Sequence, residues 1–237
     1  MLPLCEKPSV SRNTQRVLTT ELAPGVRFHE LESWSQEERD RAAEAIYRFV
    51  FRSFYRHHAF NGDPHPGNYR FSAAGDVTFL DFGLVKRWTA DEWEHLTPTL
   101  EAIVFHRDPD RLLAAMESVG FLKPGHGLAA EIVYEYVSTP YTPYLTDRFQ
   151  FTRDFVKDAM ATIIDVKGPH AHVIERLNMP PSFVILDRVV WGVSAILGKL
   201  QVEAPWRAMM LEYLHGAAPA TPMGEAAAEW KRSSVTQ

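Results

Sequence analysis

The sequence contains a single cysteine, Cys5, among its 237 residues. One thiol can form neither an intramolecular disulfide nor a multi-thiolate zinc site, which is typical of a protein from a reducing compartment. An excess of basic residues is also lacking, because 25 lysines and arginines stand against 30 acidic residues and the net charge is −5. The composition therefore gives no indication that nucleic acid is a partner.

Long hydrophobic runs are absent as well. The most apolar segment, 189–197, is much shorter than the roughly 20 residues that a membrane-spanning helix needs. The first residues lack the basic start and apolar run of a signal peptide. These absences favour a cytoplasmic protein without a membrane span. The length suits one large or two small domains, since a domain typically takes about 100 to 200 residues.

What the sequence does contain is a strong helical pattern. Ser35 and Glu38 form a capping box that begins a predicted helix reaching about His58. Its apolar positions recur at helical spacing and predict a buried stripe: Ala42, Ala45, Ile46, Phe49, Val50 and Phe54. Similar patterns predict further helices over 91–105, 109–118, 127–137, 149–165, 181–200 and 205–215. The fold class predicted is mainly α with a small β-hairpin.

Two short motifs carry the chemistry. Residues 61–68 read NGDPHPGN, and residues 81–83 read DFG. Between them, 68–72 and 77–80 predict two strands of a hairpin joined by a turn that contains glycine. Because Asn68 begins the first strand and Asp81 follows the second, their side chains are expected to be neighbours. One amide and one carboxylate suffice for Mg²⁺ when nucleotide phosphates supply further oxygens.

The spacing of Asp63 and Asn68 adds a catalytic role. Asp63 precedes Asn68 by five positions, as the Asp precedes the Asn in the catalytic loop of protein kinases, where the Asp accepts the substrate hydroxyl proton and the Asn holds a metal ion. A zinc site built from His57, His58 and His65 is the alternative. Adjacent histidines on a helix point to different faces, however, and the prolines beside His65 are better explained by a rigid loop.

These motifs resemble the UbiB/AarF atypical kinases associated with coenzyme Q biosynthesis, whose catalytic loop reads DPHPGN and is followed by DFG. The resemblance also takes in RVLTTELAPG at 16–25, which looks like the hinge of that family, and extends over roughly residues 9–215. It implies ATP and Mg²⁺ as cofactors. It further implies that Asp63 is the catalytic residue, that Asn68 and Asp81 are the metal ligands, and that the backbone of Glu21, Leu22 and Ala23 binds adenine.

The same resemblance implies a protein-kinase-like large (C-terminal) lobe with the small lobe largely absent. Only about 16 residues precede a hinge-like strand at 17–20, too few for a small lobe whose strands average about 5 to 6 residues each. The expected division is a remnant at 1–25, the large lobe at 26–215 and a flexible tail at 216–237. The implied partners are a quinone precursor or lipid, a membrane surface contacted peripherally, and a separate chain that supplies the small lobe.

Departures from the family pattern leave alternatives open. The family usually has His-Ala before DPHPGN, whereas this chain has Asn61 and Gly62, which is similar to the HGDxHxGN loop of aminoglycoside and choline phosphotransferases. Without the small-lobe lysine that neutralises phosphate charge, the chain could instead be an inactive pseudokinase-like binding module. A helix start at Thr89 soon after the DFG motif leaves no room for a long activation segment, which argues against protein substrates.

Overall fold

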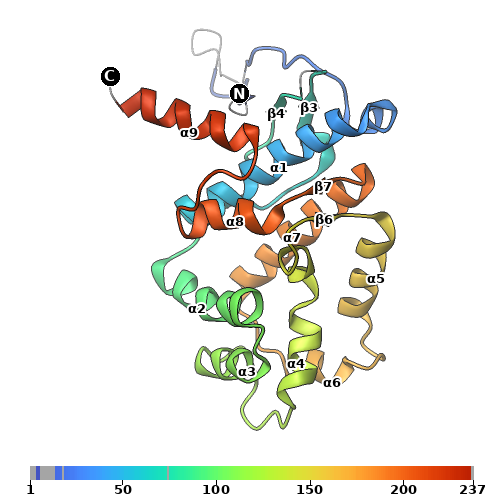
Figure 1. The fold of residues 1–237 in the computed structure, drawn as a ribbon, viewed down its shortest axis with the longest axis vertical. Helices are drawn as coiled ribbons and strands as arrows, with labels where there is room; N and C mark the ends of the chain where they lie inside the picture. Colours follow the sequence, from blue (N-terminus) through green and yellow to red (C-terminus); the bar gives the residue numbers. More distant parts are fainter. Residues whose placement is uncertain (1–3, 6–13, 18, 74, 236–237) are drawn as a thin grey trace.

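The computed structural model is mostly helical, with three small sheets among the residues that it describes (Figure 1). It describes residues 4–5, 14–17, 19–73 and 75–235. The α-helices are α1 (Gln36–His57), α2 (Ala90–Glu101), α3 (Pro109–Ser118), α4 (Ala130–Val137), α5 (Arg153–Ile164), α6 (Ala171–Arg176), α7 (Pro181–Leu200), α8 (Trp206–Leu214) and α9 (Pro222–Val235). The strands are β1 (Leu4–Cys5), β2 (Ala59–Asn61), β3 (Tyr69–Phe71), β4 (Val77–Phe79), β5 (Val85–Arg87), β6 (Phe149–Gln150) and β7 (Glu203–Ala204). The predicted class, mainly α with a small hairpin, is confirmed.

Helix α1 is the central element and begins and ends as the sequence predicts. The Ser35 side chain accepts from the Glu38 amide while the Glu38 carboxylate accepts from the Ser35 amide, so two of the otherwise unpaired N–H groups are satisfied. The helix ends at His58, whose left-handed φ of 48° turns the chain into β2. Five of the six predicted stripe residues are buried, and Phe49 packs against the core at its edge.

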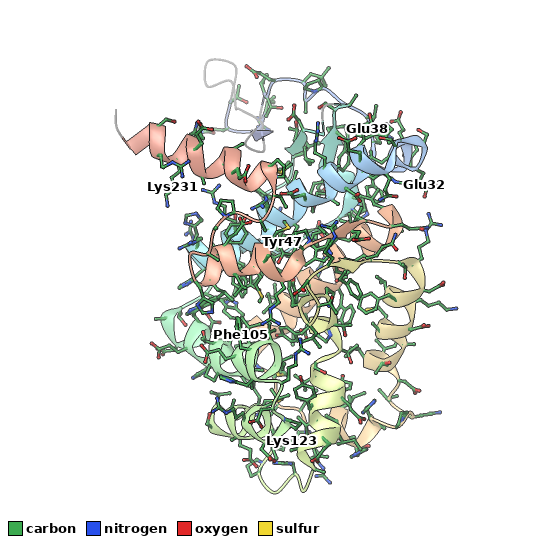
Figure 2. The ribbon with its side chains drawn as sticks, in the orientation of Figure 1. Glu32, Glu38, Tyr47, Phe105, Lys123 and Lys231 are labelled. Carbon is green, nitrogen blue, oxygen red and sulfur yellow. The ribbon has the colours of Figure 1, made fainter. Side chains whose placement is uncertain are left out.

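The core lies where α1 meets α7 and α8 (Figure 1). Tyr47, labelled in Figure 2, packs its ring 5.0 Å from Trp206 of α8 and is almost completely buried. At the other end of α1, Phe54 meets Trp88 edge to face at 5.2 Å, and Trp88 contacts Phe183 of α7. Burying these large rings fixes the position of α1 relative to α7 and α8.

Two of the small sheets surround the motif region. β3 and β4 form the predicted antiparallel hairpin, with Tyr69 opposite Phe79, and β1 adds to β4 in parallel. β2 pairs antiparallel with β5, with Asn61 opposite Val85. This second pairing was not predicted from the sequence. It joins the end of α1 to the segment that follows the DFG motif.

Beyond the motifs, the helical predictions are largely confirmed. α2 continues into a π-helical turn, Ala102–His106, so the predicted helix over 91–105 is two consecutive elements. The prediction over 149–165 began too early, because Phe149–Gln150 is strand β6 and α5 starts at Arg153. Helix α6 and the 3₁₀ segments Phe28–Ser33, Pro66–Asn68 and Thr139–Tyr144 were missed. No helix within the described ranges has the length and apolarity needed to cross a bilayer.

The two ends of the chain differ from expectation. Much of 1–25 lies outside the described residues, and of the predicted strand at 17–20 the structure describes only a single bridge at Thr20, with Leu18 not described. At the other end, residues 216–237 were expected to be a flexible tail. The structure instead has helix α9, which starts at Pro222 and lies beside α1 and α8 (Figure 1).

Candidate functional site

Antiparallel pairing between β2 and β5 brings the two motifs together. The Gly62 amide donates to the Leu84 carbonyl at 2.7 Å, directly after the last β2–β5 pair. A Cβ on Gly62 would lie 3.0 Å from the Leu84 side chain and 3.4 Å from that of Ile185. Glycine therefore permits the close approach of the catalytic-loop segment to the chain after the DFG motif.

Asn61 connects the two motifs through its side chain. Its Oδ1 accepts from the Asp63 amide at 2.9 Å, and its Nδ2 donates to the Asp81 carbonyl at 2.5 Å. One amide group thus contacts the backbone of both acidic residues. An Asn suits this position because its side chain offers both a donor and an acceptor, and both are used here.

Asp63 is held on two sides. Its Oδ2 accepts from Nδ2 of Asn68 at 3.2 Å, and the Asp63 carbonyl lies 3.3 Å from the same nitrogen. Its Oδ1 accepts from Nη2 of Arg188, on α7, at 2.9 Å. Both side chains of the ion pair are partly exposed, so its contribution to stability is small, but it orients the carboxylate.

The prolines and glycines of the loop shape its backbone. Pro64 packs against Gly192 of α7 so closely that a Cβ there would lie 2.4 Å from Pro64 Cγ. The Gly67 amide donates to Nδ1 of His65 at 3.0 Å, which turns the chain into the 3₁₀ segment that ends at Asn68. His65 is therefore occupied in shaping the loop. In the described residues, no three His, Cys, Asp or Glu side chains gather as a metal site, so the zinc alternative has no support.

The hairpin positions Asn68 and Asp81 at its open end. The Leu80 amide donates to the Asn68 carbonyl at 2.9 Å, which extends the β3–β4 ladder by one pair beyond Tyr69 and Phe79. Asp81 is the next residue, and its Oδ1 accepts from the Gly83 amide at 2.7 Å. Because Asn68 directs its nitrogen to Asp63, its Oδ1 is the atom left for a cation. The second carboxylate oxygen of Asp81 is available in the same way.

Tyr69 lies beneath this loop. Burial raises the pKa of its phenol well above the ordinary value, and the nearby charge of Asp63 raises it further. The ring is 2% exposed and packs edge to face on Phe79 of β4. Tyr69 therefore stays neutral at physiological pH.

The three residues predicted to bind adenine lie apart from this cluster. Leu22 is 94% exposed, and neither Leu22 nor Ala23 makes a hydrogen bond to another described residue. The chain returns to the hairpin at Val26, which exchanges two backbone hydrogen bonds with Phe71 at 2.8 and 3.1 Å. The segment containing Glu21 therefore leads to the turn end of the hairpin, whereas Asn68 lies at the open end.

Sequence reasoning missed three contributors to the site: Asn61, Arg188 and Gly192. Asn61 could have been found, because it replaces the histidine that the UbiB/AarF pattern has before the catalytic loop. Arg188 and Gly192 carry no local signal. They follow Asp63 by more than 120 residues, and they are one turn apart on α7, so a single helix supplies both.

Comparison with known proteins shows what this segment is similar to. The ABC1 atypical kinase-like domain matches residues 5–116, which include both motifs. The resemblance to UbiB/AarF atypical kinases is confirmed over this part of the chain. The chain is 34% identical over 125 residues to ACTIVITY OF BC1 COMPLEX KINASE 8, a chloroplastic protein of Arabidopsis thaliana, and 28% identical over 110 residues to the mitochondrial atypical kinase COQ8B of Rattus norvegicus.

These alignments cover 49% and 46% of the present chain but only 16% and 21% of the relatives, so the similarity spans about a fifth of their length or less. The fold is similar over a longer stretch to a solved structure from Mycobacterium tuberculosis, Rv3197 in complex with erythromycin. The TM-score is 0.70 at 24% identity, over 90% of this chain and 53% of that one. This likeness concerns the fold.

Proposed function

We propose that residues 61–83 form the Mg²⁺–nucleotide site of an atypical kinase-like domain that transfers or hydrolyses the terminal phosphoryl group of ATP. The observation that carries the proposal is the contact between the Asn68 amide and the Asp63 carboxylate, at the end of a hairpin that also presents Asp81. The ABC1 atypical kinase-like match over this segment supports it.

The chain's own residues have distinct roles in this proposal. Asn68 Oδ1 and the Asp81 carboxylate would hold Mg²⁺, which neutralises phosphate charge when bound. Asp63 accepts the proton of the attacking hydroxyl or water, and Arg188 and Asn68 keep its carboxylate oriented toward that group. The backbone of Glu21, Leu22 and Ala23 would contact the adenine base.

The wider setting belongs to the same proposal. We assign the helical part to the large lobe of a kinase-like fold. A quinone precursor or another lipid is the proposed partner, and the protein would work in an aqueous compartment with peripheral contact to a membrane. These assignments follow from the family resemblance.

Thermal unfolding with and without nucleotide tests the site. Mg²⁺–ATP should raise the melting temperature of the wild-type chain, ATP with EDTA should not, and Asp81→Asn should abolish the shift, because ligand that binds only the folded state stabilises it. Asp158→Asn, on the exposed face of α5, removes the same charge far from the site and should keep the shift. An unchanged shift in Asp81→Asn would contradict the proposed ligand set.

A phosphate-release assay distinguishes the two alternative functions, an inactive binding module and a small-molecule kinase. Radiolabelled phosphate release from ATP that is lost in Asp63→Asn supports a phosphotransferase or ATPase. Nucleotide binding without any release favours a pseudokinase-like module. Release that rises strongly only when an aminoglycoside or choline is added would instead favour a small-molecule kinase, as Asn61 and Gly62 suggest.

A further inference from the structure

A cavity of about 680 Å³ lies between α1, the end of α8 and α9. Three successive turns of α1 contribute Arg48, Arg52 and Arg56 to one face, and α9 contributes Lys231. Figure 2 shows Lys231 on the edge of α9 nearer to α8. This size is in the range of small-molecule sites, and Asp63, Asn68 and Asp81 are not part of its lining.

The first turn of α9 is anchored by a buried polar network. Arg48 donates from Nη1 to Glu212 Oε2 at 2.7 Å and from Nη2 to the Thr221 hydroxyl at 2.8 Å, and its Nε pairs with Glu44 at 2.6 Å. The Ala220 amide donates to Glu212 at 2.6 Å. These contacts fix the start of α9, so the cavity wall farther along the helix has a defined position.

Among the described residues that line the cavity, Glu212 is the only one with a carboxylate, and this network uses it together with Arg48. Arg52, Arg56 and Lys231 have no carboxylate partner among the described residues. Arg56 donates to the Glu212 carbonyl at 2.8 Å, which leaves its charge uncompensated. Like charges four residues apart on a helix repel, so an anion between Arg52 and Arg56 would relieve their repulsion.

The remaining walls are mostly apolar, with Ser53, His57 and Tyr213 as the polar residues among them. α9 directs Met223, Gly224, Ala227 and Ala228 toward the cavity, at the spacing of one helix face, and the other walls include Phe49 and Pro219. Small residues on α9 leave the space open in front of the cations. Phe49 closes the far side, where its ring stacks on Phe79 at 3.7 Å, so the cavity is separated from the hairpin by one aromatic layer.

We propose that this cavity binds a phosphate-bearing amphiphile, with the phosphate between Arg52, Arg56 and Lys231 and an apolar group against Phe49, Met223 and the alanines of α9. Arginine guanidinium groups bind phosphate oxygens through paired N–H donors, and the lysine adds a point charge. The site is separate from the proposed nucleotide site. The phosphate belongs either to a lipid headgroup or to a free small molecule.

Isothermal titration with octyl phosphate, with inorganic phosphate for comparison, tests the site in the whole chain. Octyl phosphate should bind more tightly than inorganic phosphate, because it also fills the apolar part. The double variant Arg52→Gln/Arg56→Gln should weaken octyl phosphate binding by about tenfold or more, equivalent to about 1.4 kcal/mol. Ala227→Phe should also weaken it, by filling the cavity while leaving every charge in place.

Two control variants show whether octyl phosphate binds in this cavity. Lys157→Gln/Arg176→Gln removes two positive charges elsewhere, and Asp81→Asn alters the proposed nucleotide site; both should bind octyl phosphate as the wild type does. Equal binding by wild type and by Arg52→Gln/Arg56→Gln, or no binding by any of them, would overturn the proposal, provided that circular dichroism shows the variants folded.

The source of the phosphate is decided by flotation with vesicles. Binding to phosphatidylglycerol vesicles but not to phosphatidylcholine vesicles, lost in Arg52→Gln/Arg56→Gln, identifies a lipid headgroup. Octyl phosphate binding without any vesicle binding identifies a free phosphorylated molecule. Vesicle binding that is unaffected by the arginine substitutions, combined with unaffected octyl phosphate binding, places the interaction elsewhere on the protein and refutes the assignment.

Discussion

On the proposed function, replacing Asn61 with alanine should weaken Mg²⁺–ATP binding without removing any side chain proposed to hold Mg²⁺ or to accept the proton. The Asn61 side chain holds the Asp63 amide and the Asp81 carbonyl at the same time, at 2.9 and 2.5 Å. A hydrogen bond contributes about 0.5 to 1.5 kcal/mol net, so the loss of two should destabilise the fold by about 1 to 3 kcal/mol. For a chain of this length, the middle of that range corresponds to a fall in melting temperature of roughly 4 to 8 °C.

The effect on Mg²⁺–ATP affinity follows from the loss of a fixed geometry between Asp63 and Asp81. Once Asn61 is removed, the backbones at Asp63 and Asp81 are no longer connected by one side chain, and nucleotide binding must restore their relative position. Fixing the backbone of a residue costs about 1 to 2 kcal/mol, so a fall in affinity of about tenfold is expected. Differential scanning fluorimetry gives the stability, and titration with a fluorescent ATP analogue gives the affinity.

The matched control is Asn178→Ala, since Asn178 also donates its side-chain amide to a backbone carbonyl, that of Gly120, at 2.9 Å. It should lower stability by about 1 kcal/mol and leave nucleotide affinity unchanged. Asn61→His should retain part of the affinity, because neutral imidazole has one donor and one acceptor. If Asn61→Ala and Asn178→Ala have the same affinity as the wild type, the bridging role of Asn61 is refuted.

Features specified within a few residues could be predicted from the sequence. The capping box at Ser35 starts α1 at Gln36, and the glycine at position 75, with φ of 81°, makes the hairpin turn that the strand pattern required. The proximity of Asn68 to Asp63 follows from a loop of four intervening residues, which the hydrogen bond between the Gly67 amide and His65 turns back on itself. Local sequence determines the helix start, the hairpin turn and the Asp63–Asn68 contact, because each depends only on the backbone conformation of a few neighbouring residues.

What could not be predicted depends on residues far apart in the chain. β2 and β5 have three residues each, and Lys86 and Arg87 give β5 no apolar alternation, so no period marks them as strands. Arg188 reaches Asp63 only because α7 packs across the loop, with Gly192 providing the space for Pro64. When two side chains are more than 100 residues apart in sequence, tertiary packing decides whether they meet. Neither the spacing nor the composition of the sequence indicates such a contact.

Helix α9 illustrates the same limit at the other end of the chain. Its Pro222 start and alanine-rich interior are helix signals, but the surrounding prolines and small residues are typical of a tail. The decisive contacts come from Arg48 and Glu212, which lie in other helices and satisfy Thr221 and the Ala220 amide. The helix is held by a buried ion pair that sequence patterns do not reveal.

Three further results are expected. Arg48→Met should destabilise the chain by about 3 to 5 kcal/mol in urea unfolding, since it leaves Glu212 buried without its partner, and faster proteolysis of α9 should accompany it. Gly192→Ala should cost about 1 to 3 kcal/mol and lower Mg²⁺–ATP affinity, because its Cβ would lie 2.4 Å from Pro64 Cγ and displace the loop; unchanged affinity would show that this packing does not position Asp63. Glu92 gives a pH dependence. Burial acts to raise its pKa, but the Thr89 amide, the Ser182 hydroxyl and Lys86 outweigh burial and lower the pKa below the ordinary value. A carboxylate with a depressed folded-state pKa stabilises the fold above its unfolded pKa and loses that contribution as pH falls through the folded value. Glu92→Gln should therefore be less stable than wild type at pH 7, and the difference should shrink steadily below about pH 4; a difference that stays constant down to about pH 2 would mean that the ionised form of Glu92 is not what stabilises α2.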